Sequence, residues 1–441
     1  MTNTSRFDPM SPKLLRIAKM ARQAPQMAFT SLNALLCADL LREAFRRLRK
    51  KGAPGVDGQT WHEYADQLEE RIPILLDLVK SGRYRAPPVR RVYIPKGVGP
   101  EKRPIGIPTI EDKMLQKAVA MILTPIYEED FHPNSYGFRP GRSAHQALVV
   151  LRKAIMDMRG GWVLEVDIRK FFDTVNHQYL RKIVRHRVRD GVILRLLGKW
   201  LKAGVLENGG VSYPEDGTPQ GGVISPLLAN AYLHEVLDRW WEETVRPRLR
   251  GRGHLIRFAD DFVIVFEYES DARRVHAVLP KRFAKFALTI HPEKTRLLCF
   301  ERPEEGRPSP DQFDLLGFTL YWARSRWGYW VVKWRTAKSR FRRGLARMKK
   351  WCRSNRHDPI RVQQEELSKR LQGHYAYYGL TGNYEALQAF RWQVIRMWRI
   401  WLSRRSQRAY LTWERFNALL ERFPLARARV VHSVNRVAAN A

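Results

Sequence analysis

Two adjacent aspartates, Asp260 and Asp261, stand between apolar, β-prone runs and carry the strongest chemical signal in the chain. The runs on either side, which include residues 262–266, predict a hairpin with both carboxylates at its tip. Burying two such groups together is costly unless a cation joins them. A third carboxylate, Asp167, lies near the end of another β-prone run, residues 163–168. The pattern predicts a divalent-metal site.

Paired metal ions serve nucleotidyl transfer, where two ions about 4 Å apart activate a hydroxyl and hold the triphosphate and the leaving pyrophosphate. Mg²⁺ prefers hard oxygen ligands and keeps several waters, so two or three carboxylates are enough. We therefore predict that Asp167, Asp260 and Asp261 bind two Mg²⁺ ions, with Mn²⁺ able to substitute. An isolated Asp-Asp pair is more often a hydrophilic turn, and the neighbouring segments are what favour catalysis here.

The segments around the aspartates alternate between helical and β-prone patterns. Helical spacing of apolar residues appears in four places: residues 30–51, 61–81, 112–127 and a segment that begins near Ala144. Two β-prone runs, 90–96 and 103–108, predict a hairpin that carries Lys96 and Arg103. The glycine-rich stretch 52–58 lacks a phosphate-loop pattern, and a turn that ends a helix is the better interpretation.

The composition narrows the class of protein. The chain has 441 residues, 44% of them hydrophobic, which is enough for two or three domains. Its formal net charge of +35 indicates a polyanionic partner, of which nucleic acid is the obvious one. No apolar run reaches the ~20 residues of a spanning helix, and the start lacks a secretory segment, so we expect a cytoplasmic protein that binds no membrane. The three cysteines are too scattered to predict a disulfide or a zinc site.

The last third of the chain is especially basic. Residues 301–441 contain 29 Lys or Arg and 11 Asp or Glu, a net charge of +18. The segment 332–357 has no acidic residue, and its apolar spacing predicts a helix with a wide basic face. A solvated face is the ordinary reading of such a run, but in this chain a phosphate-tracking surface is favoured. The tryptophans Trp392, Trp398 and Trp401 further on are expected in a helical core.

In sequence order, the segments resemble the reverse transcriptase/maturase proteins of bacterial group II introns, in the form that lacks an H-N-H endonuclease. Five ordered motifs carry the resemblance: residues 103–108, 137–143, Asp167 with 171–173, 219–222 and 259–261. Two more follow at the expected places, residues 293–295 and 316–318. The resemblance covers nearly the whole chain. It implies an α/β right-hand polymerase, with fingers and palm on an antiparallel sheet, followed by an α-helical thumb/maturase domain.

The resemblance also implies roles for single residues. The three aspartates match the family's metal ligands, and Ile168 is included with them as a metal contact. Lys96 and Arg103 match positions that clamp the incoming triphosphate, where positive charge stabilises the transition state. Phe172 matches the gate against the ribose 2′-hydroxyl, so deoxynucleotides should be preferred. Core packing is the ordinary role of such a ring, and the two roles are compatible. Gln220 matches a glutamine of the nucleotide pocket.

Further positions complete the expected site. Lys294 matches a lysine that assists proton transfer to pyrophosphate, and the primer grip consists of Leu316, Gly317 and Phe318. The predicted RNA contacts are basic side chains of the turn-rich stretch 135–143 and of the basic segment 332–357: Arg139, Arg142, Lys338, Arg342, Arg343, Lys349 and Lys350. Phe258 replaces the more usual tyrosine before the aspartate pair, which removes a hydroxyl and keeps the aromatic ring.

The expected function is RNA-directed DNA synthesis from an RNA template, a DNA or RNA primer and dNTPs. A second role, binding the intron RNA to assist splicing and retrohoming, follows from the resemblance and the basic last third. Because no paired cysteines of an H-N-H domain occur, we expect no cleavage of target DNA. The expected domains are an N-terminal extension (1–85), fingers and palm (86–320) and thumb/maturase (321–441). Two alternatives stay open: a splicing-only RNA-binding maturase, and a domesticated reverse transcriptase in repair or phage defence.

Overall fold

The computed structural model describes residues 12–95, 101–207, 210–213, 217, 221–304, 310–406 and 410–439. The chain divides into two compact units. Among the described residues, the larger unit contains residues 12–142 and 164–297, and the smaller unit contains residues 143–163 and 298–439. Compact units need not be functional domains, so the expected boundaries at 85/86 and 320/321 stay predictions.

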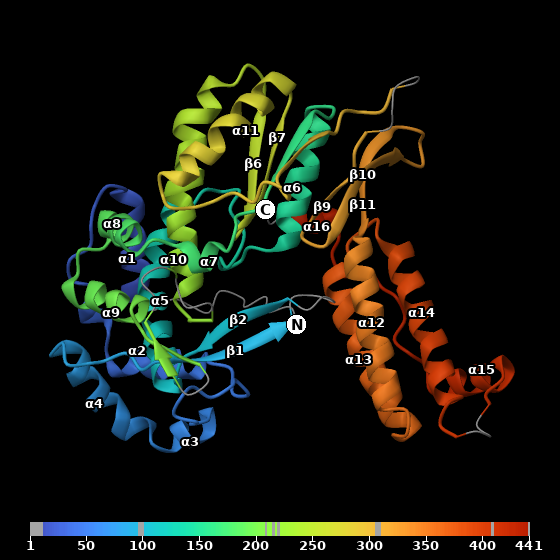
Figure 1. The fold of residues 1–441 in the computed structure, drawn as a ribbon, viewed down its shortest axis with the longest axis horizontal. Helices are drawn as coiled ribbons and strands as arrows, with labels where there is room; N and C mark the ends of the chain where they lie inside the picture. Colours follow the sequence, from blue (N-terminus) through green and yellow to red (C-terminus); the bar gives the residue numbers. More distant parts are fainter. Residues whose placement is uncertain are drawn as a thin grey trace. The chain divides into compact units, whose positions relative to one another are not determined.

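The larger unit is built on a long buried helix, α5 (Ile110–Asp130), which α1, α2 and α3 contact (Figure 1). Twelve of its residues are buried, because apolar side chains occur all around its middle turns. The other helical segments of this unit are α1 (Pro12–Gln23), η1 (Leu32–Leu35), α2 (Ala38–Arg46), α3 (Trp61–Asp66), α4 (Leu68–Lys80), α7 (Phe171–Thr174), α8 (His177–Arg187), α9 (Gly191–Leu201), α10 (Ser225–Leu233), η2 (His234–Asp238), η3 (Trp241–Val245), η4 (Arg246–Arg248) and α11 (Glu269–Ala284).

A first sheet has the order β2-β1-β4-β5. Its strands are β1 (Val89–Pro95), β2 (Lys102–Ile107), β4 (Val205–Glu207) and β5 (Gly210–Ser212). β1 and β2 pair antiparallel from Arg90 opposite Ile107 to Pro95 opposite Lys102. The predicted hairpin is therefore confirmed for its described residues, which include Arg103 but not Lys96.

A second sheet has the order β6-β7-β3-β8 and positions the aspartates. Its strands are β3 (Trp162–Val166), β6 (Gly253–Phe258), β7 (Asp261–Phe266) and β8 (Arg296–Cys299). Five consecutive residues of β7 are buried, as expected for a strand covered on both faces. Helix α11 covers one face, where Phe283 stacks on Phe262 at 6.0 Å between ring centroids (Figure 1).

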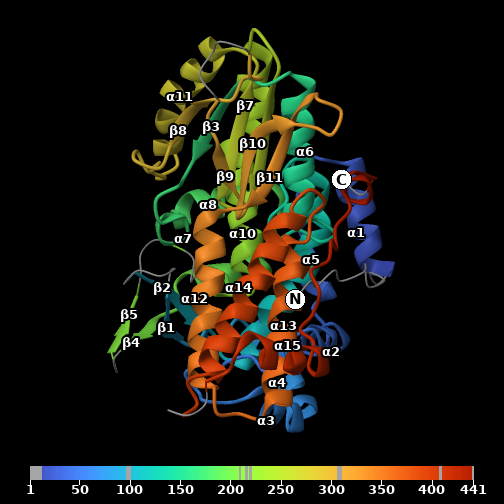
Figure 2. The ribbon, with the colours of Figure 1, turned by 90° about the vertical axis from the view of Figure 1, so that its right-hand side faces the viewer.

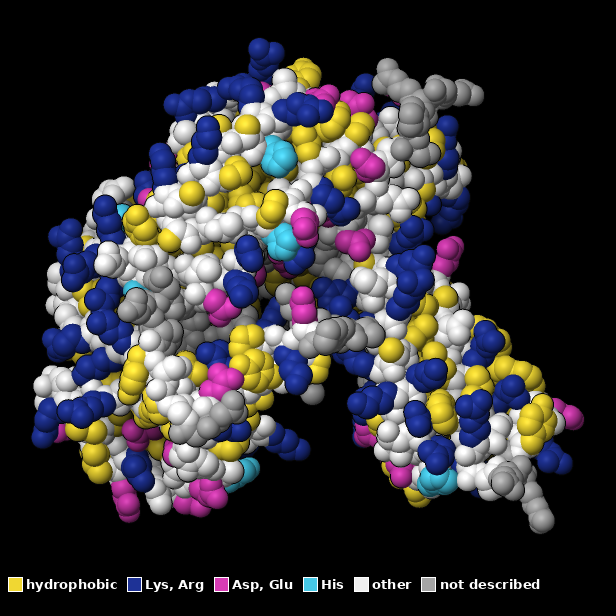
Figure 3. Space-filling model, viewed as in Figure 1, with side chains coloured by type: hydrophobic (Ala, Val, Ile, Leu, Met, Phe, Trp, Pro, Cys, Tyr) yellow, Lys and Arg dark blue, Asp and Glu magenta, His cyan; other side chains and the backbone are white. Residues whose placement is uncertain are grey.

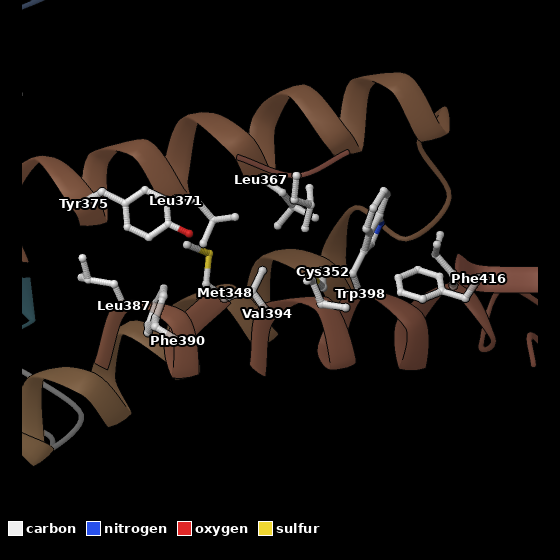
Figure 4. Close-up of a cluster of buried hydrophobic side chains, with 13 residues drawn as sticks. Met348, Cys352, Leu367, Leu371, Tyr375, Leu387, Phe390, Val394, Trp398 and Phe416 are labelled. Carbon is white, nitrogen blue, oxygen red and sulfur yellow. The ribbon is translucent and has the colours of Figure 1, made fainter. Parts of the chain in front are cut away.

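The smaller unit combines a three-stranded sheet with a helical bundle (Figure 2). Helix α6 is tied to this sheet, because Arg152 Nε donates to the carbonyl oxygen of Val332 at 2.8 Å. The bundle core contains Trp398, Leu371 and Phe416 from three helices (Figure 4). The elements of this unit are α6 (Ala144–Asp157), β9 (Phe313–Leu315), β10 (Phe318–Arg324), β11 (Trp330–Thr336), α12 (Lys338–Ser354), α13 (Ile360–Tyr378), α14 (Tyr384–Leu402), α15 (Trp413–Arg422) and α16 (Val434–Ala439).

Three of the expected helices need correction. Residues 30–51 form the short η1 and α2 rather than one helix, and residues 61–81 break at Gln67 between α3 and α4. The basic segment 332–357 begins as β11, because its first residues pair with β10 and bury Val332 and Trp334 before α12 starts. The expected core position is right for Trp398 and wrong for Trp392, which is 51% exposed and stacks on Trp413.

In the described residues, every helix falls short of the length and apolar character needed to cross a bilayer.

A pair of stacked histidines joins distant segments of the smaller unit. His145 of α6 lies 3.8 Å from His432 between ring centroids, and its Nε2 is 2.7 Å from the carbonyl oxygen of Tyr377. Burial lowers the pKa of His145 to about 4, because the charged ring would lose its hydration. His145 is therefore neutral in the folded protein at neutral pH.

We predict that acid destabilises the smaller unit through His145. The unfolded chain binds the proton near pH 6.5 and the folded chain near pH 4, so stability is lost as pH falls across this window. The loss should approach ~3 kcal/mol of unfolding free energy for this one group. In urea unfolding between pH 7 and 4, the free energy of unfolding should fall more steeply for the wild type than for His145→Gln. Parallel declines would contradict the prediction.

Candidate active site

The aspartate pair forms the tip of the β6–β7 hairpin, as predicted. Phe258 pairs with Asp261, and Ala259 and Asp260 make the two-residue turn, with Ala259 at a φ of 57°. Asp261 is exposed and Asp260 is partly buried. Burial raises the pKa of the Asp260 carboxyl, and the negative charge of Asp167 adds to this shift, while Arg103 opposes it. Asp260 therefore lies within electrostatic reach of both Asp167 and Arg103.

Asp167 directly follows β3, which neighbours β7 in the sheet. Its backbone oxygen accepts a hydrogen bond from His291 N at 2.8 Å, and its carboxylate Oδ2 lies 3.1 Å from Lys294 Nζ. Ile168, which is buried, pairs with Ile290. The segment that carries Lys294 is thus held against the strand end that carries Asp167, and Lys294 supplies a counter-ion at that carboxylate.

A buried ion pair supports the hairpin from behind. Arg257 is fully buried, and its guanidinium binds both carboxylate oxygens of Asp238, with Nε to Oδ1 at 2.8 Å and Nη2 to Oδ2 at 2.5 Å. Burial alone would raise the pKa of Asp238, but the guanidinium of Arg257 holds it well below its usual range. Arg257 Nη1 also donates to the carbonyl oxygen of Ala259 and to Asn230 Oδ1, both at 3.0 Å. The cation therefore fixes the turn that presents Asp260.

The arrangement of Asp238 depends on an irregular helix. Asp238 belongs to the π-helical segment η2, which continues α10, and π segments are frequent at functional sites. Asn230 of α10 faces the same cation and donates through Nδ2 to the carbonyl oxygen of Gly137 at 2.7 Å. Asn230 of α10 and Asp238 of η2, which follow one another in a single helical stretch, thus both contact Arg257 of the β6–β7 hairpin.

Gly137 packs directly on the aspartate turn. A Cβ at this position would stand 2.2 Å from the backbone nitrogen of Ala259, a distance that no side chain can accept. The preceding residue, Tyr136, donates its backbone N–H to the carbonyl oxygen of Arg257 at 2.8 Å. The glycine of motif 137–143 is therefore required by close approach of two backbones.

Arg139 of the same motif does not point to solvent. Its guanidinium is buried, ion-paired with Glu128 at 3.1 Å and bonded through Nη1 to the carbonyl oxygens of His132 and Ser135. This placement is at odds with the expected RNA contact, because the donors are already used inside the protein. Arg142 is partly exposed and lies 5.7 Å from the ring centroid of Tyr136.

The donor set fits a divalent cation in its chemistry. Asp167, Asp260 and Asp261 offer only hard carboxylate oxygens, and the charge of Asp167 disfavours ionisation of Asp260, a conflict that a cation would relieve. Within the described part of the chain, no three His, Cys, Asp or Glu side chains stand close enough to hold a metal as they are. The carboxylates would have to draw together around the ions.

The expected nucleotide contacts are only partly described. Arg103 is exposed on β2, opposite Ile94 of β1. Phe172 is half-buried in α7 and meets Phe171 edge-to-face at 5.3 Å. Lys96 and Gln220 lie outside the described residues. Beside the latter, Gly221 packs against β2, because a Cβ there would stand 2.5 Å from the carbonyl oxygen of Gly106.

The expected primer grip is a tight β-hairpin turn in the smaller unit. Leu316 and Gly317 both have positive φ, 51° and 83°, between β9 and β10. The carbonyl oxygen of Leu316 accepts from Tyr377 Oη at 2.8 Å, and that of Gly317 accepts from Ala337 N at 2.9 Å. Phe318 is fully buried. The turn is therefore held rigidly on both sides.

Five of the seven basic residues expected to bind RNA lie on α12, and four of these five, including Lys349 and Lys350, are exposed. Lys and Arg side chains are numerous on the surface of this helical bundle (Figure 3). A groove there runs between α12 and the end of α14, lined by Ala346, Lys349, Lys350, Arg353, Arg356, Trp401 and Arg404. The guanidinium carbons of Arg353 and Arg404 lie 6.0 and 5.4 Å from the Trp401 ring centroid. An aromatic ring with cations around it suits a nucleic-acid backbone and its bases.

Comparisons with known proteins agree with these motifs. The model of the reverse transcriptase (RNA-dependent DNA polymerase) family matches residues 94–320. Protein YkfC of Escherichia coli is 36% identical over 353 residues, which is 71% of this chain and 88% of YkfC. Group II intron-encoded protein LtrA of Lactococcus lactis is 40% identical over 308 residues, 67% of this chain and 51% of LtrA. Nuclear intron maturase 2 of Arabidopsis thaliana is 30% identical over 230 residues, 44% of this chain and 30% of that protein. The chain thus spans about half the length of LtrA.

Proposed function

Because the chain belongs to the reverse transcriptase (RNA-dependent DNA polymerase) family, we propose that Asp167, Asp260 and Asp261 form its polymerase centre. RNA-directed DNA synthesis from a nucleic-acid template and primer is the activity of this family, and the resemblance to group II intron-encoded reverse transcriptases is confirmed by LtrA. The proposal for the residues rests mainly on one observation: Arg257 fixes the Asp260–Asp261 turn, and the neighbouring strand β3 is directly followed by Asp167.

The family uses divalent metal ions, and we propose two Mg²⁺ ions held by the three aspartates, with a further contact at Ile168. When bound, such ions activate the primer 3′-hydroxyl and neutralise charge on the triphosphate. Arg103, and Lys96 with it, would bind the phosphates of the incoming nucleotide. Lys294 would supply a proton from Nζ to the leaving pyrophosphate, and its ion pair with Asp167 keeps it at the centre.

Other residues would select and orient the substrates. Phe172 would exclude the ribose 2′-hydroxyl, Gln220 would line the nucleotide pocket, and the rigid turn from Leu316 to Phe318 would position the primer strand. The test is primer extension on a primed RNA template with Mg²⁺. Extension with dNTPs and none with NTPs supports these assignments, whereas folded protein that binds RNA without extending the primer would point to a splicing-only maturase.

We predict that Phe172→Ala relaxes the choice of sugar. An apolar gate rejects an added hydroxyl by on the order of 10²-fold, and removing the ring should lose most of this discrimination. The rates of dNTP and NTP incorporation on one template give the ratio directly. The dNTP rate serves as the control for folding, since the aspartates are unchanged. An unaltered ratio would leave Phe172 with a packing role against Phe171 only.

The basic groove of α12 and α14 supports a second role. We propose that it binds intron RNA and assists splicing and retrohoming, through Lys349 and Lys350 together with Lys338, Arg342 and Arg343. The purified protein should accelerate splicing of its flanking intron at near-physiological salt, and Lys349→Gln/Lys350→Gln should weaken this effect. Primer extension without any splicing effect would favour a reverse transcriptase in repair or phage defence.

A further inference from the structure

Helices α8 and α9 present a strongly basic outer face in the larger unit. Their inner faces are buried and mainly apolar, with Leu180 of α8 and Leu196 and Trp200 of α9 in the core. The outer face carries six exposed cations, which we call the α8–α9 basic face: Arg181, Lys182, Arg185, Arg189, Arg195 and Lys202. Arg181, Arg185 and Arg189 follow at intervals of four residues, so the first two stand just over one helical turn, about 6 Å, apart along α8.

In the described part of the chain, this face has no carboxylate partner. The only acidic residue in the sequence from 177 to 206 is Asp190, and it is fully buried. Its carboxylate caps α9 by accepting from the backbone nitrogens of Val192 and Ile193 at 2.9 and 3.0 Å, and it also accepts from Asn33. Across the described ranges, none of the six cations forms an ion pair, whereas exposed Arg273 is paired with Glu269 on its own helix, α11.

The face is hollowed rather than flat. Two open grooves share Arg181 and Arg185: an outer one that also reaches His186 and Arg189, and an inner one that reaches Arg195 and Lys202. The guanidinium of Arg181 lies over Gly198 of α9, with Nη2 2.6 Å from where a Cβ would stand. A glycine at this point lets the arginine cross between the helices. Lys and Arg side chains gather along this edge of the unit in Figure 3.

Unpaired cations in a row, within grooves, fit the regularly spaced phosphates of a nucleic acid. Among the described residues, His186 is the one aromatic side chain that lines the outer groove and Tyr213 is the one that lines the inner groove. Neither groove therefore has the row of stacking platforms that successive single-stranded bases need. Duplex RNA is bound instead through its shape and phosphates. We propose that the α8–α9 basic face is a separate binding surface for duplex RNA. The inference depends on the proposed function only in that the ligand is RNA, because no groove residue belongs to the proposed catalytic, nucleotide or primer contacts.

The test uses the full chain saturated with a chain-terminated template–primer, to which a labelled blunt RNA hairpin is added. Fluorescence anisotropy gives hairpin affinity as a function of KCl concentration. Each lost phosphate contact lowers the salt slope by about 1, so Arg181→Gln/Arg185→Gln should lower it by about 2. Arg181→Lys/Arg185→Lys keeps the charges and should keep the slope. The matched control is Lys281→Gln/Lys285→Gln, which removes two exposed charges that are also four residues apart, around the end of α11.

The outcomes separate cleanly. Hairpin binding beside the template–primer, weakened in the Arg181/Arg185 glutamine variant and not in the control, supports the surface. Displacement of the hairpin by template–primer, an equal loss in the control, or equal competition by single-stranded RNA would overturn it. The polymerase proposal is judged by dNTP extension in the same preparations, which these variants should leave unchanged. If the wild type does not extend primers, the proposed polymerase residues are wrong, and the conclusion from hairpin binding is unaffected.

Discussion

Asp260→Asn should abolish primer extension and leave the fold intact. The substitution keeps the shape of the side chain but replaces a negatively charged carboxylate among the proposed metal ligands with a neutral amide. Losing a ligand of this kind costs several kcal/mol of transition-state stabilisation, so single-turnover extension should slow by about 10³-fold or more. Asp66→Asn, the same chemical change at an exposed site in α3, should extend primers at the wild-type rate.

The stability of this variant distinguishes a catalytic loss from misfolding. Burial and the charge of Asp167 raise the pKa of Asp260, so its ionised form is disfavoured in the folded protein. A carboxyl with a raised folded pKa reduces stability as pH rises through its titration, and the amide removes that penalty at neutral pH. The thermal midpoint of Asp260→Asn should therefore equal or exceed that of the wild type. Retained extension, or a clearly lower midpoint, would count against a metal-ligand role.

The elements that carry the candidate catalytic residues could be predicted from the sequence, because each is decided by a pattern of few neighbouring residues. The Asp260–Asp261 turn and the β1–β2 hairpin each lie between two adjacent β-prone runs, so neighbouring sequence decides their pairing. The long helix α5 follows from its apolar periodicity. In the basic segment after Val332, however, alternation and helical spacing both accommodate the apolar residues, and pairing with β10 selects the strand.

The support of the site could not be predicted in the same way. Arg257 is a cation inside the apolar run of β6, and its position there indicates a buried acidic partner. That partner, Asp238, comes from a π-helical segment that no periodicity in the sequence predicts. Arg139 looked like an RNA contact because its motif is turn-rich and basic, whereas its charge is used by Glu128 inside the unit. The close approach of Gly137 to Ala259 is likewise a contact across more than a hundred residues. Tertiary contacts of this kind are set by packing, which local sequence does not encode.

The Arg257–Asp238 pair yields the second large effect. Arg257→Met should destabilise the protein by about 3–5 kcal/mol, because it leaves the carboxylate of Asp238 buried and unpaired. Chemical unfolding measures this loss. The matched control is Arg252→Met, which breaks a partly exposed pair with Glu267 near the start of the same hairpin and should cost no more than about 1 kcal/mol.

A double variant separates the two tasks of Arg257. In Arg257→Met/Asp238→Leu both charges are gone, and an apolar pair of similar volume can restore much of the stability. Primer extension should stay impaired in this variant, because no donor replaces Nη1 at the carbonyl oxygen of Ala259 and the turn that carries Asp260 loses its anchor. Full recovery of both stability and extension would mean that the ion pair only fills the core. Recovered stability with slow extension would mean that the buried cation positions the catalytic carboxylate.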